Sequence, residues 1–432
     1  MAPAAVAATS TTATSRSDVR AVRGVLRLAG LLVGLVPTWA AVAQQPAQQP
    51  ARQPLLPDAP AVLASAAWQE CEVALDVTLR RAWLPKLGPG PQSLCVLTIA
   101  PAPSTTLRVA VPRGLVPTTR QARTAGALVA WNGGFFLPNG RPRGLRRSGG
   151  VELAPAGAES LATIGWRHHA YRVAGSHDDW QAWPEVLEAG PRLLQAGAVL
   201  DHGDKQRSTR HPRTAMGVAA DGSVVVVTAD GRTPLARGLS LEELGEVLLA
   251  LGCQDAINLD GGGSTTLWAE ALEVATAGSS GIANHPCDNR RFDAAGERAV
   301  ADVVLLFGTR AVVVDDDDLL VERGTLHTAS DGSGQLGGAF RWAAAAEPVR
   351  ASYRLSVPRS GRYRVERRGV VAPGLVDAAV QWFDTVAVPA DGDGVWQTVA
   401  EHTFAAGPAR LPVASVAGRP IVLDAVRLVA ID

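Results

Sequence analysis

The sequence contains little lysine and no net charge, and both scarcities limit the classes of function it can serve. Lys86 and Lys205 are its only lysines, so nearly all of its basic charge is arginine. The 41 basic residues equal the 41 acidic residues in number, which leaves no electrostatic case for binding nucleic acid or an anionic membrane. The arginine excess accompanies abundant Ala, Gly, Pro and Val and so indicates composition bias, although guanidinium groups do suit bidentate phosphate contact.

Cysteine is also scarce, with four residues and no CxxC pair, so a zinc site is not expected. Three pairings of four cysteines exist. Because local pairs close short loops, and because an exported protein meets an oxidising compartment, we predict the disulfides Cys71–Cys95 and Cys253–Cys287. The alternative is four buried free thiols.

The N-terminal region has the layout of a signal peptide over residues 1–43. Four arginines precede an apolar run that ends in Ala41-Val42-Ala43, a small-x-small cleavage pattern. The run is short and is interrupted by Pro37, which makes it a poor membrane span; the alternative is an uncleaved anchor. No second apolar run reaches spanning length, so no stable membrane span is expected after cleavage. Residues 44–67 follow as a linker rich in Gln, Pro and Ala.

The full chain of 432 residues is too long for one core. Residues 68–310 alternate short apolar runs with turn signals, and Ser240 to Leu251 is the clearest helix, with Ser240 as N-cap and one apolar face. We predict an α+β domain with mixed sheets and few helices. The other expected elements of this region are strands, at Val73–Leu79, Leu94–Ile99, Leu107–Val111, Ala127–Trp131, Val224–Thr228, Ala256–Leu259 and Val300–Phe307.

Residues 311–432 contain regular short strands separated by Gly and Asp turn signals and no helix pattern. This spacing predicts an all-β sandwich domain. The expected strands are Tyr353–Val357, Gly361–Val365, Val376–Trp382, Trp396–Phe404 and Val422–Leu428.

Four polar segments in the first domain could carry chemistry. Asn132-Gly133-Gly134-Phe135-Phe136 follows a strand and offers an amide, flexible backbone and an aromatic ring; the alternative is a tight turn. Arg213-Thr214 offers a guanidinium and a hydroxyl for a phosphate; the alternative is a surface ion pair.

The other two segments supply carboxylates. Asp230-Gly231-Arg232 ends a buried strand, although Asp-Gly also favours a plain hairpin turn. Asn258-Leu259-Asp260 is followed by Gly261, Gly262, Gly263 and Ser264, whose N–H groups could bind an anion. Three consecutive glycines are costly in chain entropy and indicate a backbone requirement, with a flexible loop as the alternative.

In this order, the segments resemble the phosphodiester glycosidases, relatives of N-acetylglucosamine-1-phosphodiester α-N-acetylglucosaminidase. The resemblance rests on NGGFF, RTAMG, DGR, the predicted helix, INLDGGGSTTLW and a closing ERAVADVVLLF strand, over roughly residues 70–308. The second domain resembles the golvesin or xanthan-lyase type of carbohydrate-binding-like sandwich. Its matching segments include Gly337-Gly338-Ala339-Phe340, Gly361-Arg362-Tyr363 and Val422 to Leu428.

The first resemblance implies hydrolysis of a glycosyl-1-phosphodiester outside the cytoplasm, with a phosphate-linked carbohydrate as partner. Asp260 is then the first candidate for the catalytic carboxylate and Asp230 the second, while Arg213 and Arg232 contact phosphate. The expected substrate-orienting residues are Asn132, Gly133, Gly134, Phe135, Thr214, Asn258, Gly261, Gly262, Gly263 and Ser264. No cofactor is certain, and a divalent cation near Asp260 is left open. The alternative function is a non-catalytic protein that binds or assembles envelope polysaccharide.

Overall fold

The computed structural model describes residues 53–158, 161–275, 278–333, 335–336, 339–375, 377–383, 385–389 and 394–431, with backbone alone at 206–207 and 385–389. The predicted signal peptide and residues 44–52 of the predicted linker lie outside the described residues. From Gln53 onward the chain forms one unit by its internal contacts. Among the described residues, no helix is both long and apolar enough to cross a membrane.

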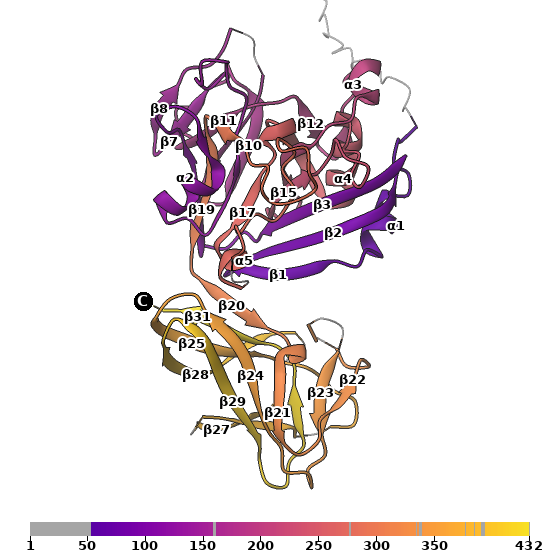
Figure 1. Cartoon of the computed structure of the whole chain (residues 1–432), viewed down its shortest axis with the longest axis vertical. Helices are drawn as coiled ribbons and strands as arrows, with labels where there is room; N and C mark the ends of the chain where they lie inside the picture. The colour runs from indigo at the N-terminus through magenta and orange to yellow at the C-terminus, as the bar shows by residue number, and fades with distance from the viewer. Residues whose placement is uncertain are drawn as a thin grey trace, which may run out of the picture. The chain divides into compact units, whose positions relative to one another are not determined.

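A large antiparallel sheet forms the centre of the first region (Figure 1). Its strands, in spatial order, are β1 (Gln69–Ala74), β2 (Val77–Leu87), β3 (Gly90–Ile99), β15 (Val224–Ala229), β14 (Arg213–Ala219), β16 (Cys253–Asn258), β12 (Arg192–Gln195) and β13 (Ala198–Val199). Every residue of β15 is buried, as its β-branched run predicts, because β3 and β14 flank it and both of its faces are covered.

Smaller sheets pack against one face of this sheet. One contains β10 (Ala170–Gly175), β9 (Ala162–Arg167), β11 (Glu185–Glu188), β7 (Arg146–Ser148) and β8 (Val151–Ala154). Another contains β17 (Leu267–Ala269), β6 (Val129–Asn132), β19 (Val303–Gly308) and β4 (Thr105–Ala110), and a short pair joins β18 (Ala299–Val300) to β5 (Val116–Pro117). Leu97, Val226, Trp131 and Leu306 meet in the shared core.

The other face of the large sheet is covered by helices α1 and α4. Leu63 of α1 and Leu244 and Leu248 of α4 pack there against Val96 and Val227. The helices of this region are α1 (Ala59–Ala64), α2 (Thr118–Ala125), α3 (Asp204–Ser208), α4 (Leu241–Ala250), α5 (Glu270–Ala275) and the short 3₁₀ turn η1 (Gly262–Ser264). The predominance of strands over helices confirms the coarse fold class, and α4 confirms the predicted helix together with its Ser240 cap.

Residues 311–431 form β-sheets with a core of their own, in which Tyr353, Trp382, Leu411 and Leu428 are buried. One sheet contains β20 (Ala311–Val314), β31 (Val426–Ala430), β25 (Gly361–Arg368) and β28 (Trp396–Phe404). A second sheet contains β21 (Leu319–Arg323), β24 (Arg350–Val357), β29 (Gly407–Ser415), β26 (Ala379–Trp382) and β27 (Thr385–Pro389). A third contains β22 (His327–Ala329), β23 (Phe340–Ala343) and β30 (Ile421–Leu423), and the turn η2 (Asp316–Asp318) precedes β21. The separation of 68–310 and 311–432 into two domains stays a prediction. Gly337, Gly338 and Val376 lie outside the described residues.

Several sequence expectations differ from the structure. Val300–Phe307 is not one strand, because it is divided at Ala301-Asp302 into β18 and β19, which belong to different sheets. Val73–Leu79 is not one strand, because the chain turns at Asp76 (φ 63°) between β1 and β2. Val422–Leu428 is divided at Asp424 into β30 and β31. Residues 53–64 of the predicted linker belong to the fold, since Leu56, Ala59 and Leu63 are buried against α4. Composition overlooked these few apolar anchors among Pro and Ala.

The predicted disulfides are wrong, because all four cysteines are free thiols. β2 lies between β1 and β3, so Cys71 and Cys95 are two strand spacings apart, about 9.5 Å, beyond the roughly 7 Å limit for bonded Cα atoms. Cys253 begins β16, whereas Cys287 lies past the opposite end of that strand, where its sulfur accepts from Arg232 Nη1 at 3.7 Å. The strand itself spans about 17 Å.

Candidate active site

A cavity of 310 Å³ collects the polar segments at one end of the large sheet. The residues that line it are Phe135, Pro191, His211, Arg213, Arg232, Leu241, Asn258, Asp260, Gly261, Gly262, Gly263 and Arg298. They come from the chain after β6, the start of β14, the turn after β15, and the end of β16. The structure therefore brings eight of the predicted site residues to one place.

Asp260 follows β16 and is held through its backbone by the loop after β6. Its N–H donates to the carbonyl of Gly133 at 3.0 Å, and its carbonyl accepts from Asn132 Nδ2 at 2.7 Å. Both polar groups of the Asp260 peptide backbone are thus fixed by one neighbouring segment. The side chain is left to turn toward the cavity.

The Asp260 carboxyl has a pKa above that of an exposed aspartate. Burial raises its pKa, against the lowering effects of Ser264, the Gly261 N–H and Arg298. Its Oδ1 accepts from the Gly261 N–H at 2.9 Å. A raised pKa keeps a larger protonated fraction near neutral pH than an exposed aspartate has, which suits a group that donates a proton.

Arg213 and Arg232 bring two positive charges to the same cavity. Arg213 Nε donates to the Leu239 carbonyl at 3.0 Å and Nη2 to the Thr209 carbonyl at 3.3 Å. Burial and the neighbouring Arg232 lower the pKa of Arg213 to about 10. Among the described residues, neither guanidinium has a carboxylate within ion-pair distance. Two such groups side by side favour an anionic ligand.

Two further residues of the cavity were missed by the motif reasoning. Arg298 Nε donates to Asp288 Oδ2 at 2.7 Å, and it lies in the closing ERAV segment, whose match was noted without a role. Burial lowers the pKa of His211, and the nearby charges of Arg213 and Arg232 lower it further. Its imidazole is therefore neutral near pH 7 and can accept a proton. Its position directly before Pro212-Arg213 was the only sequence signal.

The glycine requirement of the Gly261–Gly263 segment is visible at Gly262. Its φ is +63°, a left-handed conformation, and a Cβ added there would lie 2.9 Å from Arg232 Nη2. A side chain at position 262 would therefore strain the backbone and displace the guanidinium. The glycines serve close approach by arginine. The N–H groups of Gly261 and Gly262 already donate to Asp260 Oδ1 and the Pro212 carbonyl, which corrects the expectation that they bind the ligand.

Several predicted substrate residues lie beneath the cavity instead of lining it. Asn132 is 0% exposed, and its Oδ1 accepts from Thr214 Oγ1 at 2.8 Å and from the Thr266 N–H at 3.1 Å. Thr214 and Ser264 are fully buried as well. These three side chains position Asp260 and the glycine segment, and their burial leaves them no direct contact with a substrate.

Gly133 and Gly134 also act as packing residues. The Gly134 N–H donates to Asp302 Oδ1 at 2.8 Å, and a Cβ at Gly134 would lie 2.2 Å from Arg146 Nη2. Arg146 and Asp302 form a fully buried ion pair with 3.1 Å between Nε and Oδ2. The two glycines let the backbone pass over this pair, which fixes the loop that holds Asp260.

Asp230 does not share the cavity with Asp260, contrary to its prediction as second catalytic carboxylate. It is 1% exposed, and its oxygens accept from Ser93 Oγ at 2.6 Å, from the His285 N–H at 2.8 Å and from Asn284 Nδ2 at 3.1 Å. His285 Nδ1 lies 2.9 Å from the same carboxylate. These hydrogen bonds occupy both oxygens of the Asp230 carboxyl. Asp230 follows β15 and Asp260 follows β16, and β14 lies between these two strands.

Asn258 combines a buried amide with an open acceptor. Its Nδ2 donates to the carbonyls of Gly190 and Leu259 at 2.9 and 2.7 Å, so the side chain cannot rotate freely. Its Oδ1 is buried and has no partner among the described residues, and the residue lines the cavity. An unpaired buried acceptor is costly unless a ligand hydroxyl or amide donates to it.

The donor set around Asp260 does not fit a divalent cation. Calcium and magnesium take several oxygen ligands, often more than one carboxylate. Here Asp260 is the one carboxylate among the described lining residues, and Arg213, Arg232 and Arg298 share the cavity with it. Arg298 is paired with Asp288, and the charges of Arg213 and Arg232, which have no carboxylate partner among the described residues, favour an anion here.

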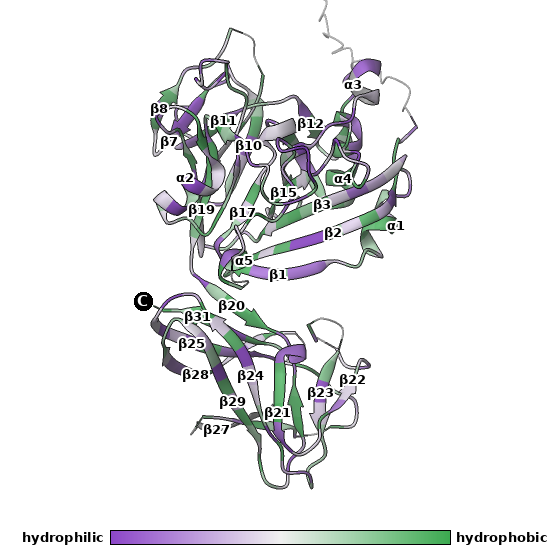
Figure 2. Cartoon of the chain, viewed as in Figure 1, coloured by the Kyte–Doolittle hydropathy of each residue, from purple (hydrophilic) through white to green (hydrophobic). Residues whose placement is uncertain are grey.

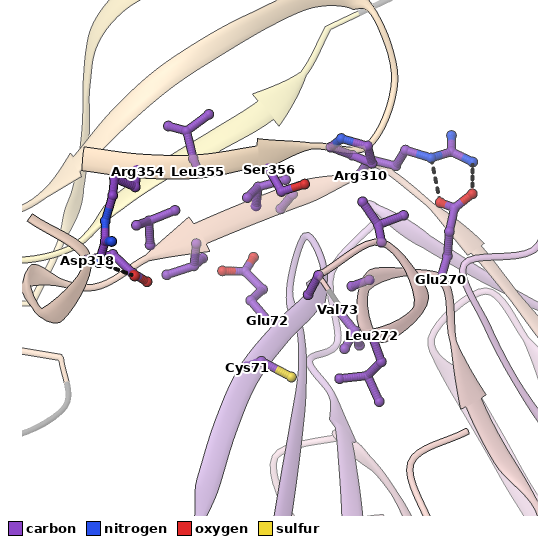
Figure 3. A pocket seen from close by; sticks show the side chains of 18 residues that line it. Cys71, Glu72, Val73, Glu270, Leu272, Arg310, Asp318, Arg354, Leu355 and Ser356 are labelled. Carbon is purple, nitrogen blue, oxygen red and sulfur yellow. Dashed lines mark hydrogen bonds and ion pairs between the residues drawn. The ribbon is translucent and has the colours of Figure 1, made fainter. Parts of the chain in front are cut away.

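A second cavity, of 460 Å³, is lined by Cys71, Glu72, Leu272, Val312 and Leu355, among others (Figure 3). Figure 3 shows Glu270 paired with Arg310, whose Nε lies 2.7 Å from Glu270 Oε2. Glu72 has Arg427 as a partner at 3.2 Å. Because its charged groups are already matched in pairs, this cavity is a weaker candidate for chemistry than the arginine-lined one.

The site therefore combines a buried acid with two guanidinium groups that lack carboxylate partners among the described residues, on a β-sheet scaffold. Residues 125–307 match the family model described as phosphodiester glycosidase. This central part of the chain is therefore similar to the phosphodiester glycosidase family, as its motifs indicated.

Named relatives agree with this assignment. N-acetylglucosamine-1-phosphodiester alpha-N-acetylglucosaminidase of Bos taurus is 30% identical over 200 residues, which cover 39% of this chain and 38% of the relative. The Homo sapiens protein of that name is 31% identical over 167 residues, 34% of this chain and 32% of the relative. The zebrafish catalytic domain, auto-inhibited by its pro-peptide, is 21% identical with a TM-score of 0.44, covering 56% of this chain and 87% of that one. The chain thus spans about two fifths or less of the length of the two curated relatives.

Proposed function

We propose that the cavity around Asp260 hydrolyses a glycosyl-1-phosphodiester. Water adds to the anomeric carbon, the bond from that carbon to the bridging oxygen breaks, and the phosphate leaves as a monoester on its partner. The observation that supports this reaction best is one cavity that combines a buried carboxyl with two guanidinium groups lacking carboxylate partners among the described residues.

The roles follow from how burial and charge separate the pKa values. Asp260, with its raised pKa, donates the proton to the bridging oxygen. His211, with its lowered pKa, stays neutral and takes the proton of the attacking water. Arg213 and Arg232 bind the phosphate and stabilise the charge that grows on it as the bond breaks. Asn258 Oδ1 accepts a hydrogen bond from the sugar.

The test is turnover of UDP-N-acetylglucosamine, an α-linked sugar phosphodiester, by the purified protein. Asp260→Asn and Arg213→Ala should each lower kcat/KM by about 10²- to 10³-fold, the scale of losing a general acid or a charge-stabilising donor. Arg108→Ala, which removes an exposed guanidinium on β4, is the matched control and should leave turnover unchanged. Full activity in both site variants would contradict the assignment.

The same assay separates the alternative function. A wild-type protein that binds phosphate-linked glycans but turns over none of a panel of sugar phosphodiesters would be a binding or assembly protein for envelope polysaccharide. We also propose export by the 1–43 leader, and a carbohydrate-binding accessory role for the β-sandwich at 311–432, on the sequence patterns alone. N-terminal sequencing of the secreted protein tests the first of these.

A further inference from the structure

A third cavity, of 580 Å³, is lined in part by Ser93, Asn284 and His285, the residues that bond to the Asp230 carboxyl. Its lining includes Gln69, Arg81, Trp83, Asn284, His285 and Phe292. The proposed reaction uses none of these residues. The cavity mixes aromatic rings with planar hydrogen-bonding groups, as small-molecule sites do.

Strand register builds the floor of this cavity. Arg81 pairs with Gln69 on β1 and with Cys95 on β3, and Trp83 pairs with Ser93. Directly paired residues of antiparallel strands point to the same side. Alternation along β2 puts Trp83 and Arg81 on the same face as Leu79, which is buried in the shared core. Figure 2 shows a hydrophilic middle part of β2 between more hydrophobic parts of the same strand.

Trp83 is unusual for a core-facing position, because 53% of it is exposed. Its indole Nε1 donates to the Leu235 carbonyl at 2.9 Å, which holds the ring in place. Beside it, the buried Nε of Arg81 has no partner among the described residues. A fixed, exposed indole and an unsatisfied guanidinium donor are costly for a structural surface and useful for binding.

The opposite wall is set by Asp230. Its carboxylate faces Nδ1 of His285, and the imidazole stacks on Phe292 with ring centroids 3.8 Å apart and an interplanar angle of 15°. One ring edge and one ring face are therefore occupied. The edge that carries Nε2 remains for the cavity. Asp230 thus fixes the orientation of His285 through a buried charge, which explains why a carboxylate ends β15 without joining the active site.

We propose that this cavity binds a neutral pyranose residue of a glycan. The apolar C–H face of the sugar stacks on the Trp83 indole, and its hydroxyls bond to Arg81, Gln69 and His285 Nε2. The ligand class follows from the combination of a flat aromatic surface with several planar donors and acceptors and no cluster of like charges. The binding is independent of hydrolysis, so the proposal does not need the proposed function to hold.

The experiment is isothermal titration of the full chain with phosphate-free trisaccharides: chitotriose, cellotriose, maltotriose and mannotriose. At least one should bind the wild type. Trp83→Ala should weaken that binding by about tenfold or more, the scale of one lost aromatic contact together with its buried area. Trp83→Phe, which retains an aromatic face, should restore part of it. Thermal melts of each variant check that the fold is unchanged, as expected for an exposed side chain.

Matched controls place the binding. Arg213→Ala should disable the active site and leave trisaccharide binding intact, so failure of the two proposals can be told apart. Trp396→Ala, which removes a ring from the β-sandwich region that contacts Arg368 and Arg427, should also leave binding intact. The proposal is overturned if no trisaccharide binds the wild type at millimolar concentration, if Trp83→Ala binds as the wild type does, or if Trp396→Ala alone abolishes binding.

Discussion

Asp260 links stability to acidity at the scale of one residue. Because burial raises its pKa in the fold, its favourable contribution is complete below the unfolded value of about 3.9 and is lost as the pH rises through the higher folded value. Asp260→Asn keeps the shape of the side chain and stays neutral. We therefore expect the variant to melt at a higher temperature than the wild type at pH 7.5, with little difference at pH 3.5.

Asp221 provides a control of opposite sign. Hydrogen bonds from the backbone and side chain of Ser223 lower its pKa, so its stabilising effect exists above the unfolded pKa and fades as the pH falls. Asp221→Asn should lower the melting temperature at pH 7.5 and have no effect at strongly acid pH. If Asp260→Asn behaved in this way too, the carboxyl of Asp260 would not be held in a costly charged state.

Single residues show where sequence reasoning reached the site and where it stopped. Asp260, Arg213 and Arg232 line the cavity, as their motifs predicted. Asp260 and Arg232 are next to glycines, and Arg213 begins the RTAMG segment. Asp230 is also a carboxylate at a strand end next to glycine. However, β14 lies between β15 and β16, and Asp230 does not line the cavity that contains Asp260. Asn132 is polar, next to glycines and at a strand end, yet its partners come from β14 and the Thr266 segment. Long-range pairing decided both cases, and no local pattern reports it.

Helix α4 is the element on which the arginine geometry depends. Ser240 Oγ accepts from the Glu243 N–H at 3.2 Å, and Glu243 Oε2 accepts from the Ser240 N–H at 2.8 Å, a complete capping box. Glu243 also pairs with Arg210, and the Leu239 carbonyl just before the cap accepts from Arg213. The cap therefore supports the segment that positions the guanidinium of Arg213.

Ser240→Ala should cost about 1 kcal/mol of unfolding free energy, the usual value of an N-cap, or roughly 2–4 °C in a domain of this size. Because the cap adjoins Leu239, we also expect a higher KM for the phosphodiester substrate. Ser240→Thr retains the hydroxyl and should largely preserve both properties. Denaturant melts and steady-state kinetics measure the two effects, and an unchanged melting curve for the alanine variant would show that the box carries no weight.

Elements with strong signals were predictable in type, and their ends were not. The helix had an N-cap, acidic residues in its first turn and one apolar face, so three independent signals agreed. The consecutive valines of β15 predicted a buried strand. The turn at Asp76 contains no glycine or proline, so the sequence predicted a single strand where the structure has the hairpin of β1 and β2. Asp424 broke the last predicted strand because its carboxylate accepts from the Leu336 N–H, a contact 88 residues away in sequence.

The thiols test the fold of the whole chain. Since the structure keeps Cys71, Cys95, Cys253 and Cys287 apart, protein unfolded without reductant should react with a thiol reagent at four positions. In the native state the reaction should be slow, because burial raises the pKa of Cys71, Cys95 and Cys253, the last to about 12. Reductant should leave the melting temperature unchanged. Mass spectrometry that found two disulfides in the purified native protein would contradict this arrangement.

At this scale the sequence indicated the class of fold through its short strands and few helices. The order β1-β2-β3-β15-β14-β16 could not be read from it, because strands more than a hundred residues apart pair in the middle of the sheet. That pairing is what gathers the Asp260 and Arg213 segments. The disulfide error has the same origin, since short loops favour local pairs only when no strand lies between the two cysteines.

The Asn132–Gly133 peptide has a consequence for how preparations of the protein age. In Asn-Gly sequences the glycine nitrogen readily attacks the side-chain amide and releases ammonia, because glycine has no Cβ to hinder it. Here the Gly133 N–H donates to the Asp302 carbonyl at 3.0 Å and the amide of Asn132 is held by Asp260. Asn139–Gly140 is the same dipeptide in an exposed turn. Peptide mapping after alkaline storage should find deamidation at Asn139 first, and any at Asn132 would record molecules in which the loop that holds Asp260 had opened.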